Sequence, residues 1–346
     1  MDRDETGTLD EALLRLHRTG PEFEDWLSNH GPMAVEALVR HGEGARVHRW
    51  LDGYARRLEE RPGRYDRITE ENREERLGDP RYLADWAVYF EERLAERPWR
   101  EVLAAWWPRL LPGIAAAATH PVIRVGHAVR VLLRDGENEP RRAELAHGLG
   151  YWAARHQPLP VGVVPLPAPV GAGHALRAVP PVADRSGGIR HRLAQLSEVP
   201  AWVEPGTVAP DGVPERLDEL VRGATGYYAS HAHGQPVMLV HAATAPNAVR
   251  RTLPALPREL WPASLLWAWS ASAAVVAAYA PADGPHRPPD AAGVTGEELF
   301  ARAAAHGDEH AIKLVDTVLD VAADRAGDPL PLGAGLRAVE LIEPVS

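Results

Sequence analysis

The sequence predicts an all-α fold: a single large helical domain, residues 1–346, with long proline- and glycine-rich connecting loops. Through most of the chain, apolar residues recur every three or four positions, which is the spacing of a helix with one buried face. Strand-like alternation of apolar and polar residues is sparse, and no internal repeat is evident. Prolines and glycines concentrate between most of the helical segments, as expected of loops.

The first half of the domain, residues 1–156, is predicted to be helical almost throughout. Pro32 and Pro121 stand at helix starts, where proline suits the first turn. Pro108 and Pro112 are expected to divide one apolar stretch into two short helices. The helix that follows Pro121 is apolar on almost every side and should be fully buried. The predicted helices cover Leu9–Arg18, Pro32–His41, Tyr82–Glu96, Val102–Ala118, His120–Leu133 and Glu144–His156.

Residues 157–188 are expected to form a loop that joins the two halves. Prolines recur through this segment, interleaved with glycines and valines, and such a composition cannot propagate a helix. Loops of this length are usually functional lids or linkers, so this one is also a candidate cover for a site. Its prolines are Pro158, Pro160, Pro165, Pro167, Pro169, Pro180 and Pro181.

The second half, residues 189–346, returns to helical periodicity around a second proline-rich loop, Pro281–Pro289. No uninterrupted apolar stretch reaches the roughly 18 residues that a bilayer crossing requires, so no membrane-spanning segment is expected. The predicted helices cover Pro214–Tyr228, Val237–Val249, Trp261–Tyr279, Gly296–His306 and Asp308–Ala323.

Composition narrows the possible classes of function. The net charge of −10 argues against a nucleic-acid partner, because phosphate backbones are bound by cationic surfaces. The absence of cysteine excludes disulfides, iron–sulfur clusters, thiolate metal sites and a cysteine nucleophile. The first residues are charged and polar, so we expect neither a signal peptide nor a membrane anchor, and we expect a cytoplasmic protein.

Lysine usage singles out one position. Of 38 cationic residues 37 are arginine, and the only lysine is Lys313. If its segment is helical, His310 and Lys313 share one face, with His306 one turn earlier. Neutral imidazole is the commonest protein ligand for divalent metals, and a lysine whose pKa falls on burial can react with CO2 to form a metal-binding carbamate. Alternatively, scarce lysine reflects GC-rich coding bias, and Lys313 lies on a solvated helix face.

Five of the 16 histidines share an apolar setting, with Ala, Val, Leu, Met or Gly around them rather than charges. A polar ring in such surroundings needs a partner, since burial without one costs about 1–3 kcal/mol. Each ring taken alone is more often a core histidine bonded to a carbonyl. Together with Lys313 they can converge on a metal inside a helical bundle. The five are His30, His120, His127, His241 and His310.

The other histidines are expected to matter less. His231 and His233 lie two residues apart, on opposite sides of a helix, so we expect loop residues near a site rather than ligands. The neighbours of the remaining histidines are polar or arginine, which favours exposure. Asp308 and Glu309 are candidates either for carboxylates that orient a metal ligand or for helix caps. The histidines expected to be exposed include His17, His41, His48, His191 and His286.

Familiar catalytic templates are missing. Gly171–Leu176 begins like a dinucleotide-binding fingerprint but lacks the third glycine, a preceding strand and a following helix. There is no phosphate-binding loop of the Walker type and no nucleophile elbow of a serine hydrolase. The tryptophans at helical spacing are predicted core residues, although a pocket for a flat aromatic ligand would use the same residue type. They are Trp99, Trp106, Trp107, Trp261, Trp267 and Trp269.

Five segments, in this order, resemble landmarks of the questin oxidase-like family. No one of them is specific alone, and their joint order carries the resemblance, which runs from about Leu13 to about Leu319. The segments are Asn29-His30-Gly31-Pro32-Met33, His120-Pro121-Val122-Ile123-Arg124, Glu144–Arg155, Pro236–Thr244 and Glu309-His310-Ala311-Ile312-Lys313.

The resemblance implies an oxygenase of secondary metabolism. The family is associated with oxidative cleavage of anthraquinone-type aromatic polyketides, a Baeyer–Villiger insertion of oxygen from O2 that opens a quinone ring. It implies a non-haem Fe(II) centre, and NADPH is a candidate external reductant. The implied ligands are the imidazoles of His30, His120, His241 and His310 and a carboxylated Lys313.

Three further residues receive hypotheses. His127 stands where relatives often have an aromatic residue, so here it is either a further metal ligand or a pocket-lining residue. Arg124 and Tyr227 are hypothesised to orient phenolate oxygens of the substrate. A nitrogen-rich ferrous site with an open position suits O2 activation, and a carbamate would add negative charge that favours the higher oxidation state.

Two other functions compete with the oxygenase. One is a metal-free helical binding protein for an aromatic metabolite, whose histidines satisfy one another. The other is a metallohydrolase with a carbamylated lysine, although such enzymes usually bring an aspartate ligand and a barrel of strands. The sequence leaves open the particular polyketide and the oligomeric state.

Overall fold

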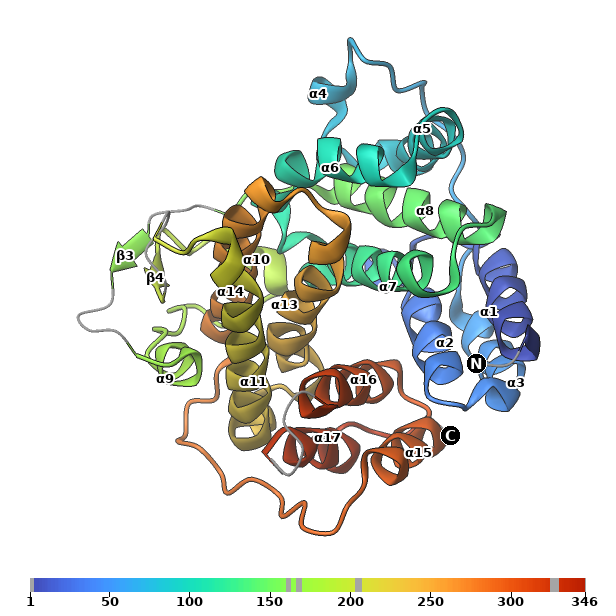
Figure 1. Ribbon diagram of the computed structural model, residues 1–346. Helices are drawn as coiled ribbons and strands as arrows, with labels where there is room; N and C mark the ends of the chain where they lie inside the picture. The colour runs from blue at the N-terminus through green and yellow to red at the C-terminus, as the bar shows by residue number, and fades with distance from the viewer. Residues whose placement is uncertain (1–2, 160–162, 166–169, 203–206, 324–329, 346) are drawn as a thin grey trace. The chain divides into compact units, whose positions relative to one another are not determined.

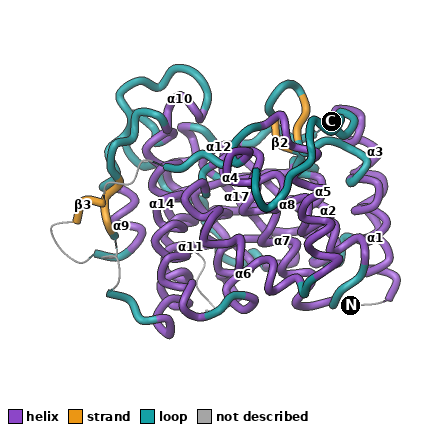
Figure 2. The backbone as a smooth tube through the Cα atoms, turned by 90° about the horizontal axis from the view of Figure 1, so that it is seen from above, coloured by secondary structure: helices purple, strands orange, loops and turns teal. Residues whose placement is uncertain are grey.

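The computed structural model describes residues 3–159, 163–165, 170–202, 207–323 and 330–345, and these are mainly helical (Figure 1). The predicted all-α fold is confirmed. Within the described ranges the sheets are two pairs of short strands, β1 with β2 and β3 with β4. Figure 2 shows how little of the backbone is strand compared with helix and connecting loop.

The chain divides into two compact units. Unit 1 comprises Met1–Pro158 and Arg251–Leu260, and unit 2 comprises Leu159–Arg250 and Trp261–Ser346. The first division falls at the start of the loop predicted from its prolines. Residues 251–260 belong with unit 1, although they lie within the second half of the sequence. The interpretation of the whole chain as a single domain stays a prediction.

Unit 1 is built around α8, which packs along both α5 and α7. Residues 120–132 of α7 are all buried, which confirms the prediction of a fully buried helix. The elements of unit 1 are α1 (Arg3–Leu16), β1 (Glu22–Phe23), β2 (Leu27–Ser28), α2 (Gly31–Arg40), α3 (Val47–Tyr54), α4 (Arg73–Arg76), α5 (Leu83–Glu96), α6 (Trp99–Leu110), α7 (His120–Asp135) and α8 (Glu139–Arg155).

Three details of unit 1 differ from expectation. Pro108 does not divide a helix, because it falls within the last turn of α6, and Pro112 lies in the short 3-10 turn that follows. Helix α8 begins five residues before the predicted start, since the Asn138 side chain accepts the Arg141 N–H and caps it. Helices α3 and α4 were not predicted from the periodicity.

Unit 2 is built around α11, which packs against α9, α14, α16 and α17. Its elements are β3 (Val163–Pro165), α9 (Ala172–Arg177), α10 (Ile189–Leu193), β4 (Val199–Ala201), α11 (Val213–His231), α12 (Pro236–Leu239), α13 (His241–Thr252, whose last two residues belong to unit 1), α14 (Trp261–Tyr279), α15 (Gly296–His306), α16 (Glu309–Ala323) and α17 (Leu330–Leu341).

Two expectations for unit 2 were wrong. Residues 157–188 do contain a helix, α9, because Ala172–Arg177 is a proline-free island of helix-forming residues whose Ala172, Ala175 and Leu176 are buried. The predicted helix Val237–Val249 is instead two helices, α12 and α13, separated at Val240. The strand pair β3–β4, which is parallel, and helices α10 and α17 were not predicted.

The predicted aromatic core is largely confirmed. Trp99, Trp106 and Trp107 are buried in unit 1, and Trp269 is buried in unit 2. Trp261 and Trp267, at the start of α14, are only half-buried. The Trp106 indole packs edge to face against Trp86, with ring centroids 5.4 Å apart.

One helical stretch among the described residues, Arg258–Tyr279, is long and apolar enough to cross a membrane by length and composition. However, 67% of its most apolar window is buried inside the protein. Such burial is typical of the core helix of a soluble protein, because a bilayer-spanning helix would expose this surface to lipid. The cytoplasmic location stays a prediction.

Candidate metal centre

His120 lies directly after a strained turn in unit 1. Ala117, Ala118 and Thr119 all have positive φ (42°, 55° and 68°), a backbone region that costs a non-glycine residue roughly 1–2 kcal/mol. The turn brings the Ala117 carbonyl back onto the Nδ1 atom of His120, the first residue of α7. Strain of this kind persists where the surrounding structure holds it, often at functional sites.

The contact with Ala117 decides the tautomer of His120. A carbonyl only accepts hydrogen bonds, so Nδ1 carries a proton, and in the tautomer that is protonated only there the lone pair is on Nε2. That lone pair lies 2.7 Å from Nε2 of His30, and the two rings meet edge to face. An Nε2–H of His30 donating to His120 fits this distance, and a metal ion could replace that proton.

His30 owes its position to the turn before α2. Its backbone N–H donates to the Tyr54 hydroxyl at 2.7 Å, and the Asn29 side chain accepts the N–H of Gly31 at 2.9 Å. His30 and His120 are both buried, with 5% and 6% of their surfaces exposed, which confirms the burial expected from their apolar sequence neighbours. Unit 1 therefore presents two buried imidazoles with facing Nε2 atoms.

His241 in unit 2 repeats the arrangement of His120. It is the first residue of α13, not the middle of a longer helix as predicted, and its Nδ1 donates to the Met238 carbonyl at 3.0 Å. In both cases the acceptor is three residues earlier, at a break in the helix. In this tautomer the lone pair is on Nε2, and the His310 ring lies 5.7 Å from the His241 ring, centroid to centroid.

The break predicted between the helices Gly296–His306 and Asp308–Ala323 is confirmed, so His306 is not one turn before His310 on a continuous helix. Helix α15 ends at His306, and Gly307 adopts a left-handed conformation (φ 84°) that suits glycine and turns the chain. The His306 Nε2 instead donates to the Ile342 carbonyl at 3.0 Å. His306 is thereby separated from the face that His310 and Lys313 share.

Asp308 serves as the cap of α16 and also lies next to His310. Its Oδ1 accepts the backbone N–H groups of His310 and Ala311 at 2.8 Å and 3.2 Å. The same oxygen is 3.4 Å from Nδ1 of His310. The two roles proposed for this carboxylate from sequence are therefore both compatible with its position, and it is suited to orient the His310 ring.

Lys313 is fully buried one helical turn after His310. Burial lowers the pKa of its amine to about 7, against the opposing effect of the carboxylates of Glu309 and Asp308. The Nζ atom has no hydrogen-bond partner among the residues that the structure describes. The solvated-face interpretation of Lys313 is therefore wrong, because a buried, unpartnered amine is costly unless it binds or reacts with something.

His127 has other partners in unit 1. Its Nδ1 donates to Glu36 at 2.8 Å, and its Nε2 lies 3.1 Å from an N–H of Arg251. Burial, the largest influence, lowers its pKa, so the ring is neutral. The same Glu36 carboxylate binds Arg130. Because both ring nitrogens already have hydrogen-bond partners, this geometry favours a structural role for His127 over metal ligation.

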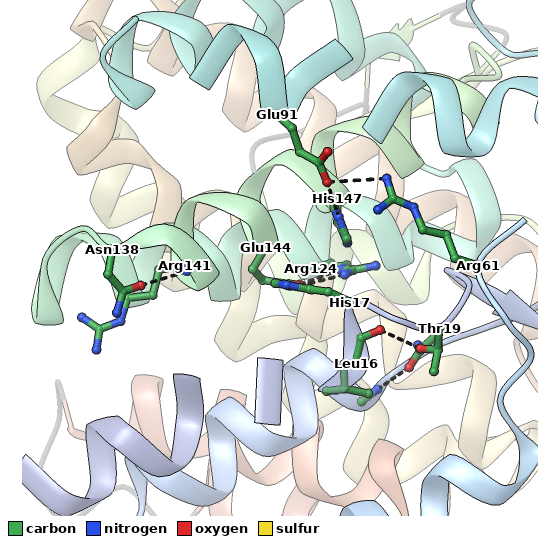
Figure 3. A network of polar contacts seen from close by, with 12 residues as sticks. Leu16, His17, Thr19, Arg61, Glu91, Arg124, Asn138, Arg141, Glu144 and His147 are labelled. Atoms are coloured by element: carbon green, nitrogen blue, oxygen red, sulfur yellow. Dashed lines mark hydrogen bonds and ion pairs between the residues drawn. The ribbon is translucent and has the colours of Figure 1, made fainter. Parts of the chain in front are cut away.

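Arg124 is bound to a carboxylate rather than open to solvent. Its Nε and NH2 groups donate to the two oxygens of Glu144 at 2.6 Å and 2.8 Å, and His17 lies 2.9 Å from the same carboxylate (Figure 3). His17 was expected to be exposed, but only 11% of its side chain is. The substrate-orienting role of Arg124 stays a prediction, and two of its five N–H donors are bonded to Glu144.

A second histidine, His147, adjoins this group. Its Nε2 donates to Glu91 at 2.8 Å, and its ring lies 4.5 Å from that of His17. Figure 3 shows Arg61 on the other side of Glu91. A small cavity beside Thr19, Arg124, His147 and Tyr151 completes the network. These buried charges hold α1, α5, α7 and α8 of unit 1 together.

We expect the protein to lose stability as the pH falls from about 6.5 towards 4. Burial, only partly opposed by Glu91, lowers the pKa of His147 from 6.5 to about 4. The unfolded chain then binds a proton that the folded protein does not, so stability is complete above the unfolded pKa and declines below it, by up to about 3 kcal/mol. Urea unfolding at several pH values measures this decline, and His147→Gln should flatten it. An equal decline in the variant would show that His147 is not responsible.

Tyr227, on α11, is buried and stacks on His231 with ring centroids 4.0 Å apart. Burial raises its pKa to about 12, so the phenol is protonated at neutral pH. It can therefore donate its O–H but cannot act as a phenolate. Its role towards a substrate stays a prediction.

Several polar residues in these networks were not identified from the sequence. Both Glu36 and Glu144 are buried. Glu36 has almost only apolar neighbours in α2, and a lone carboxylate in such a run was the available signal, since it requires a cationic partner. Glu144 follows two arginines in α8 and gave no such signal. His17 gave no such signal, because its neighbours are charged and its burial depends on packing.

Comparison with known proteins supports the resemblance over part of the chain. A family model described as questin oxidase-like matches residues 27–157. This range contains His30, His120, Arg124 and His127, whereas His241, His310 and Lys313 lie outside it. No curated protein matches the chain. The family resemblance is thus confirmed for the first part of the sequence, and it supports an oxidoreductase of the oxygenase class.

Proposed function

Residues 27–157 of this chain are questin oxidase-like, and from that premise we propose that the protein is a non-haem iron-dependent oxygenase of secondary metabolism. Its reaction would be a Baeyer–Villiger-type insertion of oxygen into, or cleavage of, a quinone ring of an aromatic polyketide. The observation that carries the proposal is Lys313, a fully buried amine without a hydrogen-bond partner in the described residues. Nothing in a purely structural helix would call for such a group.

The donor set suits iron. In unit 1, His30 and His120 present facing Nε2 atoms 2.7 Å apart, and in unit 2, His241 presents an Nε2 whose ring is oriented by a backbone carbonyl. A ring fixed through Nδ1 in this way is the usual arrangement of a metal-binding histidine. We propose as ligands the imidazoles of His30, His120, His241 and His310 and a carboxylated Lys313.

Carboxylation of Lys313 follows from the state of its amine. A lysine with a pKa of about 7 is about half free amine at pH 7, whereas an ordinary lysine is almost entirely protonated there. The amine attacks the carbon of CO2 to form an N–C bond, one proton is released to solvent, and a carbamate anion remains. The carbamate supplies oxygen ligands in a protein that has no cysteine and supplies the negative charge that four neutral imidazoles lack.

Each group then has a defined task. A bound Fe(II) would supply the redox chemistry that O2 activation requires. Tyr227, which stays protonated, is proposed to donate its O–H to a phenolate oxygen of the substrate. Arg124 is proposed to donate to the same phenolate oxygen. To do so it would give up its hydrogen bonds to Glu144 and form new ones to the substrate. Asp308 positions His310, and His127 with Glu36 supports α7. NADPH is proposed as an external reductant where the substrate does not provide the electrons.

The test is metal content after anaerobic loading with Fe(II) and desalting. We expect about one iron per chain in the parent and loss of that iron in His120→Ala and in His241→Ala. His147→Gln is the matched control, since this buried histidine lies outside the proposed ligand set and should keep its iron. Turnover is then tested separately, as O2 uptake with the reduced, hydroquinone form of an anthraquinone, measured with and without NADPH. Iron retained by both alanine variants would contradict the assignment.

The main alternative is a metal-free binding protein for an aromatic metabolite. The specific observation in its favour is the 2.7 Å contact between His30 and His120, because two imidazoles that bond to each other need no metal. Tight binding of the aromatic compound without iron and without product would support it. A metallohydrolase is less favoured, since the described residues form no barrel of strands; hydrolysis without O2 and two metals per chain would point to it.

A further inference from the structure

A second group of metal-ligand side chains lies in unit 2 and includes none of the residues proposed to bind iron. His233 is in the 3-10 turn Ala232–Gly234 that follows α11, and Asp283 and His286 are in the proline-rich loop after α14. The two imidazole rings stack with centroids 3.6 Å apart and planes at 7°. Each Nε2 faces a different oxygen of Asp283, at 3.4 Å for His233 and 3.5 Å for His286.

These distances do not describe ordinary hydrogen bonds. An N–H···O bond is usually 2.7–3.2 Å long, and the buried Nε2 of His233 has no hydrogen-bond partner in the described part of the chain. They match instead the separation of ligand atoms around one ion. With metal–nitrogen distances of about 2.0–2.1 Å, the edge of a tetrahedral site is roughly 3.3 Å.

The backbone around the cluster is already held in place. The His286 N–H donates to the Ser230 carbonyl at 2.8 Å, which ties the loop to the end of α11. Arg337 of α17 donates to the carbonyls of Arg287 and Ala229, and so joins the same two segments. A Cβ atom at Gly234 would lie 2.9 Å from the Pro281 nitrogen, so only glycine permits this close approach.

The chemistry of the donors selects the kind of ion. Hydrogen bonding to its own backbone N–H is the main cause that lowers the pKa of Asp283, so the carboxylate is ionised at neutral pH. Two imidazoles with one carboxylate favour Zn²⁺ or another late first-row divalent ion over Mg²⁺ or Ca²⁺, which prefer oxygen ligands. His286 is about half-exposed and His233 is nearly buried, so the half-exposed ring can turn to bring both lone pairs onto one ion.

We propose that His233, Asp283 and His286 form a second metal site, which takes a divalent ion such as Zn²⁺ and clamps the loop Pro281–Pro289 onto the end of α11. Three protein ligands leave a fourth position for water, as in other open zinc sites. The site is independent of the proposed iron ligands, since it shares no residue with them.

The test is the number of Zn²⁺ ions that the metal-free full chain binds, with Zn²⁺ alone as the probe. Asp283→Asn and His286→Ala should each bind about one Zn²⁺ per chain fewer than the parent. His191→Ala is the matched control, because His191 is an equally exposed histidine 2.9 Å from a single carboxylate, Asp184. The difference between parent and variant does not depend on whether the iron centre exists, so the two proposals can fail separately.

A second measurement reports on the clamp. Hydrogen exchange of the His286 N–H, which donates to Ser230, should slow about tenfold at a free Zn²⁺ concentration about ten times Kd, and His286→Ala should show no such slowing in its loop. Equal Zn²⁺ binding by parent, Asp283→Asn and His286→Ala would overturn the site. If the variants bind one Zn²⁺ fewer but Zn²⁺ does not slow hydrogen exchange of the His286 N–H in the parent, the clamp would be overturned.

Discussion

Lys313→Met is expected to stabilise the metal-free protein and to abolish its iron binding. The parent buries an amine that has no hydrogen-bond partner in the described residues, whereas methionine is of similar length and apolar. The lowering of the lysine pKa from 10.5 to about 7 corresponds to a cost of roughly 5 kcal/mol at neutral pH. Removing it should raise the free energy of unfolding by at least about 2 kcal/mol, as measured in urea.

The cost of burying the Lys313 amine also predicts how the free energy of unfolding changes with pH. Between about pH 7 and 10.5 the unfolded lysine binds a proton that the folded one does not, so the stability of the parent should rise with pH. The rise should be absent in Lys313→Met. Both proteins must be measured free of metal and of CO2, since a carbamate would change the titrating group.

The predicted loss of iron binding in Lys313→Met is measured separately from its stability. With ¹³C-bicarbonate and diamagnetic Zn²⁺ in place of Fe(II), the parent should show a carbamate carbon resonance that Lys313→Met lacks. With Fe(II), the parent should hold about one iron per chain that the variant has lost. Because Lys313 is the only lysine, no other side-chain amine can give that signal. Iron bound equally by both proteins would remove the lysine from the site but leave the histidine ligands untouched. A destabilised Lys313→Met would contradict the cost assigned to the buried amine.

Glu144→Gln is expected to destabilise the protein by about 3–5 kcal/mol, the largest loss predicted here. Glu144 accepts two bonds from Arg124 and faces His17, and all three are largely buried. Arg124 is the main partner that lowers the Glu144 pKa, to about 2, against the effect of burial. The neutral glutamine leaves an arginine charge buried without its carboxylate, and breaking a buried pair on one side costs this much.

Two control variants distinguish loss of the Arg124–Glu144 ion pair from a change of packing at position 144. Asp184→Asn breaks an exposed carboxylate–histidine pair and should change stability by less than about 1 kcal/mol. Arg124→Met combined with Glu144→Leu removes both charges and should recover much of the loss. A double variant no more stable than Glu144→Gln would show that packing, not charge, is responsible. A double variant that folds, binds iron and keeps full turnover would contradict the proposed role of Arg124 towards the substrate.

Much of the helical architecture could be predicted because it follows from the local spacing of apolar residues. Trp261–Tyr279 was predicted at both ends, and Leu83–Glu96 to within one residue, since their apolar spacing is strong. The failures are short or capped elements. Helix α9 is a short helix within a proline-rich segment. The start of α8 depends on the Asn138 cap, a single residue that the apolar spacing does not reveal.

The candidate site could be predicted only in part. The burial of His30, His120, His127, His241 and His310 was expected from apolar neighbours and is confirmed. For Lys313 the sequence left burial and a solvated face open, and the structure shows burial. What each ring nitrogen binds was not predictable. His120 and His241 present Nε2 because helix breaks bring carbonyls onto Nδ1, whereas both nitrogens of His127 are taken up by Glu36 and Arg251.

The sequence by itself determined that this is a helical protein with one lysine and several histidines in apolar surroundings, because hydrophobic spacing and residue identity act locally. Tertiary structure alone decided which of those groups keep an available donor atom. Arg124 is occupied by a glutamate 20 positions away, and His17 by the same glutamate from 127 positions away. The physical reason is that a buried polar atom takes whichever partner the packing brings to it, and partners so distant in sequence leave no local signal.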